Sequence, residues 1–221
     1  MTPTPDAPHL TVRGEAHLET EPELARIGIT LTARGTDRRA TLADLTRRNT
    51  TTLDLVKTYG DAVEHLETSA LTITPELTRH GRGERVRAHH GHLHLTAELN
   101  DFTALGELTT RLADLDLTRI DGPWWTLRPT SPAHKQARQQ AVHDAVQRAR
   151  EYAEALGTTL TALLDLTDTE PEPAHPLDRA MRTMTYGAEN TDGPAPLDLE
   201  PQRRHIHAQV TARFTMAPPN L

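Results

Sequence analysis

The sequence feature with the clearest chemical potential is a histidine-rich run over residues 89–94. On a β-strand alternate side chains share one face, so His90, His92 and His94 would project together at intervals of about 7 Å. Imidazoles at this spacing can bind zinc, nickel or copper ions. The run therefore raises the hypothesis of a metal-binding strand.

A second pair of histidines alternates in the same way near the C-terminus. His205 and His207 occupy the polar face of a strand predicted over residues 203–216. If this strand and the histidine-rich strand were neighbours, the two sets of imidazoles would converge. The tentative ligand set is His90, His92, His94, His205 and His207.

The competing interpretation is a solvent-exposed histidine face. Leu93, Leu95, Ala97 and Leu99 alternate with polar residues and predict a buried face on the other side of the strand. No carboxylate with the spacing of a known metal motif accompanies the histidines. We therefore predict a solvated face, with no metal and no cofactor, and keep metal binding as the alternative function.

Trp124 and Trp125 are the second candidate for ligand binding. Neighbouring residues of a strand face opposite ways, so one of the two rings must point away from the core of its own sheet. That ring could line a pocket for a small ligand, or it could pack beneath another part of the protein. We favour packing and keep the pocket as the alternative.

Nucleophilic catalysis finds little support in the sequence. There is no cysteine, and the two serines, Ser69 and Ser131, lie outside any Gly-x-Ser-x-Gly motif. Ser131 is better explained as the N-cap of a helix. Acidic residues and histidines are plentiful, which leaves acid–base catalysis open, but they form no recognisable catalytic set. We expect a protein without enzymatic activity.

Composition restricts the partners and the compartment. A net charge of −7 and a pI near 6.0 give no general attraction to nucleic acid or to an anionic membrane surface. No charged N-terminal region precedes an apolar run, so we expect no signal peptide, and no apolar segment approaches the length of a membrane span. The lack of cysteine fits a reducing compartment. We expect a soluble, cytoplasmic protein.

The best-defined element is a helix that follows Ser131 and ends at Gly157. Pro132 suits the first helical position, and Gly157 can adopt the left-handed conformation that closes a helix. A stripe of mostly small apolar residues follows one side of the helix and predicts close packing on a sheet. This stripe consists of Ala137, Ala141, Val142, Ala145, Ala149, Ala153 and Leu156. We expect the helix to pack over the first strand, a strand at 159–166 and the last strand.

Residues 24–128 read as strand, helix, strand, strand, helix, strand. This order predicts a ferredoxin-like (βαββαβ) unit. The first strand, the long helix with its following strand, and the last strand remain, and they can form a second layer. We therefore predict an α+β fold of two-layer sandwiches of antiparallel sheet and helices, with the ferredoxin-like unit inserted into a second small α+β domain.

The predicted domain boundaries follow from this order. Residues 1–8 are rich in proline and threonine, which predicts a disordered N-terminus. The outer domain is discontinuous, the inserted domain is continuous, and a long proline-rich loop precedes the last strand. The outer domain comprises residues 9–22 plus 129–218, and the inserted domain comprises residues 23–128. The long proline-rich loop covers residues 168–201. Apolar residues of the loop predict docking on a neighbouring surface; they are Leu177, Met181, Met184 and Tyr186.

Several short strings, taken in their order along the chain, resemble the SIMPL-domain family, named for a signalling molecule that associates with a pelle-like kinase. The resemblance spans about His9 to Met216. The strings are Val12-Arg13-Gly14-Glu15-Ala16, Pro22-Glu23-Leu24-Ala25, Ile27-Gly28-Ile29, Asp101-Phe102, Leu105-Gly106, and Ala137, Ala141, Ala145, Arg148-Ala149, Ala153 and Leu156-Gly157.

The resemblance implies a two-part α+β fold, no enzymatic reaction and, from bacterial relatives, a tendency to form oligomers. Many bacterial members are exported, whereas this chain shows no export signal. We expect a homo-oligomer, with contacts to another protein as the second option. The predicted hairpin over 63–99 offers a tip and edges that could pair with another copy.

Overall fold

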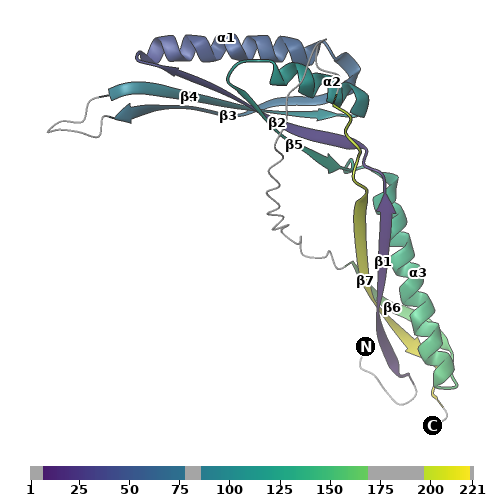
Figure 1. Cartoon of the computed structure of the whole chain (residues 1–221). Coiled ribbons are helices and arrows are strands. Elements are labelled where there is room, and N and C mark those ends of the chain that lie inside the picture. The colour runs from purple at the N-terminus through teal and green to yellow at the C-terminus, as the bar shows by residue number, and fades with distance from the viewer. Residues whose placement is uncertain (1–6, 78–85, 169–196, 220–221) are drawn as a thin grey trace, which may run out of the picture. The chain divides into compact units, whose positions relative to one another are not determined.

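The computed structural model describes residues 7–77, 86–168 and 197–219. In this part of the chain the fold is α+β, with three α-helices and two antiparallel sheets (Figure 1), which confirms the predicted class. The helices are α1 (Arg38–Lys57), α2 (Phe102–Ala113) and α3 (Pro132–Ala155), with a short 3₁₀ turn η1 (Gly60–Ala62). The strands are β1 (His9–Thr20), β2 (Leu24–Gly35), β3 (Val63–Leu77), β4 (Val86–Leu99), β5 (Thr118–Thr126), β6 (Leu160–Asp168) and β7 (Arg204–Met216).

The chain divides into two compact units. The first holds β1, α3, β6 and β7, and the second holds β2 to β5 with α1 and α2. The first unit comprises residues 1–20, 129–186 and 203–221, and the second comprises 21–128 and 187–202. Residues 1–6 and the apolar loop residues between 177 and 186 lie outside the described residues, so the predictions about them stay predictions.

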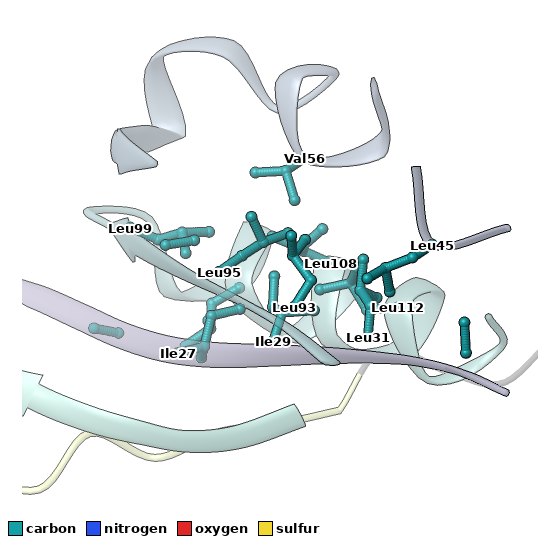
Figure 2. Packing of buried hydrophobic residues seen from close by; sticks show 14 residues of the cluster. Ile27, Ile29, Leu31, Leu45, Val56, Leu93, Leu95, Leu99, Leu108 and Leu112 are labelled. Atoms are coloured by element: carbon teal, nitrogen blue, oxygen red, sulfur yellow. The ribbon is translucent and has the colours of Figure 1, made fainter. Parts of the chain in front are cut away.

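The four-stranded sheet of the second unit has the order β3-β4-β2-β5, with every neighbouring pair antiparallel. Helices α1 and α2 lie on one face of this sheet (Figure 1). Apolar residues alternate along β2 and β4 and meet leucines from both helices in one core (Figure 2). The largest fully buried apolar side chains are Ile27, Ile29, Leu31, Leu45, Val56, Leu95, Leu99, Leu105, Leu108 and Leu112. The predicted order of elements is observed, and the ferredoxin-like label stays a prediction.

Each α-helix begins at a residue whose side chain accepts hydrogen bonds from the first turn. Asp37 accepts from the backbone N of Ala40 at 2.8 Å, and Asp101 accepts from Ala104 N at 3.0 Å. The predicted cap Ser131 accepts from Ala133 N at 3.3 Å. These bonds satisfy amide groups that have no partner within the helix and fix where each helix starts.

The buried face of α1 differs from the prediction at one position. The apolar spacing of Leu42, Leu45, Leu53 and Val56 in the sequence predicts that all four face the core, but Leu42 is 42% exposed, so this prediction is wrong for Leu42. The buried residues are Thr41, Leu45, Thr52 and Val56. Because Leu42 follows Thr41 by about 100° around the helix, it lies beside this face. A buried threonine occupies the place that a purely apolar pattern would assign to leucine.

The three-stranded sheet of the first unit has the order β1-β7-β6. β1 and β7 pair along their whole lengths, and α3 packs on them through alanines spaced four residues apart. Ala141 and Ala145 are fully buried. A Cβ added to Gly14 of β1 would lie 2.1 Å from the carbonyl oxygen of Ala141. Helix and strand therefore touch backbone to backbone, as the alanine stripe predicted.

Candidate functional site

The structure places the histidine-rich run on β4 with its polar side facing away from the helices. Leu93 and Leu95 are buried in the core, whereas His92 is exposed and His90 is half-buried. The three histidines therefore lie on the face away from the core, where His92 is exposed and His90 and His94 are half-buried. His94 Nδ1 lies 3.0 Å from the hydroxyl oxygen of Thr30 on β2.

One histidine of this face belongs to an ion-pair network. His90 Nε2 lies 2.8 Å from Glu76 Oε2, and the guanidinium of Arg34 donates to the same oxygen at 2.8 Å. The bond from Arg34, followed by that from His90, lowers the pKa of the Glu76 carboxyl to about 2. This carboxylate therefore holds its charge at neutral pH and links β2, β3 and β4.

The two histidine strands are not neighbours. β4 pairs with β3 and β2, whereas β7, which carries His205 and His207, pairs with β1 and β6 in the other sheet. The five predicted ligands could converge only if β4 and β7 were adjacent strands, and they are not.

His207 instead meets two residues of β1 that the sequence did not single out. His17 lies opposite His207 in the register, and their rings stack with centroids 4.4 Å apart and planes 15° from parallel. The ligand atoms of Glu15, His17 and His207 all lie within 4.8 Å of one another. The Nε2 atom of His207 is buried and has no hydrogen-bond partner among the described residues. We call these three residues the β1–β7 cluster.

The β1–β7 cluster lies on the face of the sheet opposite α3. Val12 and Ala16, which alternate with the cluster residues along β1, are buried in the core under the helix. The side chain of Glu15 is 38% exposed. Its backbone amide donates to Asp144 Oδ2 of α3 at 3.0 Å, which ties this point of β1 to the helix. The cluster therefore stands on a rigid strand pair, with His17 exposed to solvent and His207 half-buried.

The two tryptophans face opposite ways, as predicted. Trp125 packs edge-to-face on Phe102 of α2, with ring centroids 4.8 Å apart. Trp124 is 50% exposed on the other face of the sheet, where a Cβ on Gly28 would lie 3.5 Å from its ring. Gly28 thus leaves room for the ring to lie over β2.

β6 is an edge strand with exposed leucines. Among the described residues it pairs only with β7, where Leu163 lies opposite Phe214 and Leu166 opposite Ala212. Phe214 and Ala212 face the core under α3. Leu163 and Leu166 are nevertheless 53% and 45% exposed, because α3 packs on β1 and β7 and hardly reaches β6. The expectation that the helix would also cover this strand is wrong.

Comparison with known families identifies the chain. The sequence model of the family described as "SIMPL: Protein of unknown function (DUF541)" matches residues 10–214, nearly the whole length. The chain belongs to the SIMPL family. A search of curated proteins found no match. The family description assigns no reaction, ligand or partner to a SIMPL protein, so a role for this one has to be argued from its own surfaces.

Among the described residues of this SIMPL protein, the ionisable groups with a clearly shifted pKa are partners in ion pairs. Hydrogen bonds from Arg128 and then Asn100 lower the pKa of the Glu64 carboxyl, and the bond to Glu64 raises the pKa of Arg128. Together with Glu76, these shifts favour the charged forms. Catalytic acids and bases usually show the opposite shift, toward a neutral form near pH 7. No helix among the described residues is both long and apolar enough to cross a membrane.

Proposed function

We propose that this SIMPL protein works by self-association, and that two copies join through the edge of β6 rather than acting as an enzyme. The observation that carries this proposal is a strand edge that no other described residue pairs with, combined with two exposed leucines on the helix side of the sheet. An unpaired edge offers a row of free N–H and C=O groups to a further strand. Burial of the leucines would add an apolar contribution to the pairing.

The other sheet edges are less suited to pairing. The backbone N of Glu15 on β1 already donates to Asp144. β3 contains Pro75 and three shifts in its register with β4, and β5 contains Pro123. Proline and irregular register are devices that protect strand edges. β6 has two register shifts toward β7 but contains neither proline nor glycine.

The sequence of β6 also permits a symmetric partner. Antiparallel pairing of two β6 strands about an axis between Leu164 and Asp165 would place Leu163 of one copy opposite Leu166 of the second. The four leucines would then form one apolar cluster on the helix side of a continuous six-stranded sheet. In this register Asp165 lies opposite Leu164, so the two Asp165 carboxylates do not face each other directly. A second copy of the chain is therefore the occupant that fits.

The size of the effect follows from the exposed fractions. Full burial of a leucine side chain stabilises by about 1.5–3 kcal/mol, so burying the exposed half of each leucine contributes about 1 kcal/mol. The four leucines together contribute about 4 kcal/mol, which corresponds to about 1,000-fold in the dimer dissociation constant. The double variant Leu163→Ser/Leu166→Ser should weaken association by about this factor.

Sedimentation velocity and light scattering on the full chain test the proposal. We expect wild type at twice the chain mass of 24.5 kDa, and the double serine variant at the monomer mass. The matched control is Leu71→Ser, because Leu71 is 56% exposed on β3, an edge strand of the other sheet. This control should stay dimeric. A monomeric wild type, a dimeric double variant, or a Leu71→Ser variant that alone dissociates would refute the β6 interface.

The non-enzymatic part of the proposal has a separate test. The proposal that the protein is not an enzyme is supported by Glu64, Glu76 and Arg128, which are ion-paired and whose pKa shifts favour their charged forms. We expect hydrolysis of generic ester, amide and phosphate substrates to stay at the rate of buffer alone. Turnover that copurifies with the protein and disappears after a single substitution would contradict this expectation.

A further inference from the structure

The β1–β7 cluster brings together three side chains that are typical metal ligands. Glu15 offers a carboxylate, and His17 and His207 each offer an imidazole nitrogen, all within 4.8 Å of one another. They come from opposite ends of the sequence and meet only because β1 and β7 pair in this register. On a tetrahedral zinc ion the ligand atoms lie about 3.3 Å apart. Metal binding therefore requires side-chain rotations that bring the three ligand atoms closer together.

The burial of one ring nitrogen is a second, independent observation. His207 Nε2 is shielded from solvent, and within residues 7–77, 86–168 and 197–219 no hydrogen-bond partner satisfies it. A buried polar atom without a partner is energetically costly, so native proteins nearly always satisfy such atoms, sometimes with an ion. A metal ion that binds Nε2 would remove this cost. Simple ring stacking with His17 leaves the nitrogen unsatisfied.

We propose that Glu15, His17 and His207 bind a divalent transition-metal ion, for which zinc is the representative. Two imidazoles and one carboxylate suit this class of ion, whereas calcium and magnesium prefer oxygen ligands. Three protein ligands leave a fourth position for water. The histidine run on β4 takes no part in this site.

The surrounding charges are compatible with a bound cation. Arg13 Nη1 lies 3.9 Å from Glu15 Oε1, and its side chain is 58% exposed. A surface ion pair of this length contributes little to stability, so the Arg13 side chain can turn into solvent when a cation binds. Glu19 and His205 form the next cross-strand pair on the same face. Their side chains add a carboxylate and an imidazole beside the site.

The rigid backbone beneath the cluster favours binding. The amide of Glu15 is held by Asp144, and β1 and β7 pair without a register shift from His9 to Thr20. The three ligands therefore start from fixed Cα positions, and binding restricts only their side chains. The site lies on the face away from α3 and does not use the β6 edge, so it goes beyond the proposed self-association.

Isothermal titration of the full chain, produced without a histidine tag, with zinc chloride tests the site. We expect one zinc ion per chain. His17→Ala and His207→Ala should each weaken binding by about 10-fold to 100-fold or abolish it, and Glu15→Gln should weaken it while keeping the shape of the side chain. Circular dichroism of each variant checks that the fold is retained.

The matched control is the double variant His92→Ala/His94→Ala, which removes two imidazoles from the other sheet. It should bind zinc as wild type does. Replacement of zinc by cobalt(II) should give the visible absorption of a four-coordinate site in wild type and in this control, and not in His207→Ala. No zinc binding by wild type, unchanged binding by His17→Ala and His207→Ala, or loss only in the His92→Ala/His94→Ala variant would overturn the proposal.

Discussion

Replacing Gly14 by alanine tests the closest contact in the first unit. The new Cβ would lie 2.1 Å from the carbonyl oxygen of Ala141, 2.5 Å from the backbone N of Ala145 and 2.6 Å from its Cβ. Ordinary contacts begin near 3.4 Å, and two of these three atoms belong to the backbone. No side-chain rotation can relieve the overlap, so α3 must move away from β1 by about 1 Å.

The expected loss of stability is at least that of an overpacked core. Overpacking costs typically about 1–3 kcal/mol, and here the displaced body is a helix of 24 residues whose buried alanines all lose contact together. We therefore expect the upper part of this range. The matched control is Gly28→Ala on β2, because the nearest atoms to its new Cβ belong to the imidazole of His94, which can turn. The control should cost about 1 kcal/mol at most, which is the contribution of the hydrogen bond between His94 and Thr30 that a turn of the ring would break.

Urea unfolding followed by two signals locates the effect. Both tryptophans lie in the second unit, so their fluorescence reports on that unit, whereas far-ultraviolet circular dichroism also reports on α3. In Gly14→Ala the circular dichroism transition should move to lower urea, and the tryptophan transition should move less. A Gly14→Ala variant as stable as wild type by both signals would refute the close packing of α3 on β1.

Three further predictions use the same measurements. Ala145 is fully buried, so Ala145→Leu should destabilise the protein by about 1–3 kcal/mol. Ala155 is exposed, so Ala155→Leu should be nearly neutral. Equal effects of the two substitutions would contradict the packing of the alanine stripe. Asp101→Ala should destabilise the second unit, as followed by tryptophan fluorescence, by about 1 kcal/mol, because the Asp101 side chain caps α2 through Thr103 N and Ala104 N. An unchanged unfolding midpoint would show that this cap does not stabilise the unit. Because the pKa of Glu76 is lowered to about 2, the stability that its charge contributes should be present above about pH 4.5 and lost as the pH falls through 2. In Arg34→Ala, carboxyl chemical shifts from NMR should show that pKa rising toward 4.5, and a pKa near 2 in this variant would rule out the arginine as its main cause.

Local patterns in the sequence predicted much of the fold because each depends on nearby residues. The four-residue spacing of Ala137, Ala141 and Ala145 marks a helix face, and Ser131 marks its start. The alternation of Leu93 and Leu95 with histidines gives the two faces of β4 correctly. Where the pattern met a buried polar residue, as at Thr41, it assigned the neighbouring Leu42 to the core and was wrong.

The candidate sites depend on which strands are neighbours, and alternation does not report this. The alternation of Val12, Gly14 and Ala16 predicts that His17 lies on the polar face of the first strand, as His207 does on the last. Only the register of β1 with β7 brings the two histidines together. The sequence signal for the cluster is that an antiparallel pairing of the first and last strands of the outer domain places His17 and His207 on the same face of one sheet. The exposure of Leu163 likewise depends on which strands α3 covers, a question of packing between distant segments.

The pairing of β1 with β7 also sets an order of events during synthesis. Twelve residue pairs join the first described strand to the last one, and all of residues 21–128 lie between them. A growing chain therefore exposes β1 before the ribosome has made its partner, and the loop that must close is long. The second unit, whose strands and helices are contiguous from 21 to 128, can form in the meantime. Within this unit the backbone N of Glu23 donates to the carbonyl oxygen of Thr126 at 3.0 Å, so the segments that lead to β1 and to α3 are adjacent in the completed unit, and β7 is the last strand to be added.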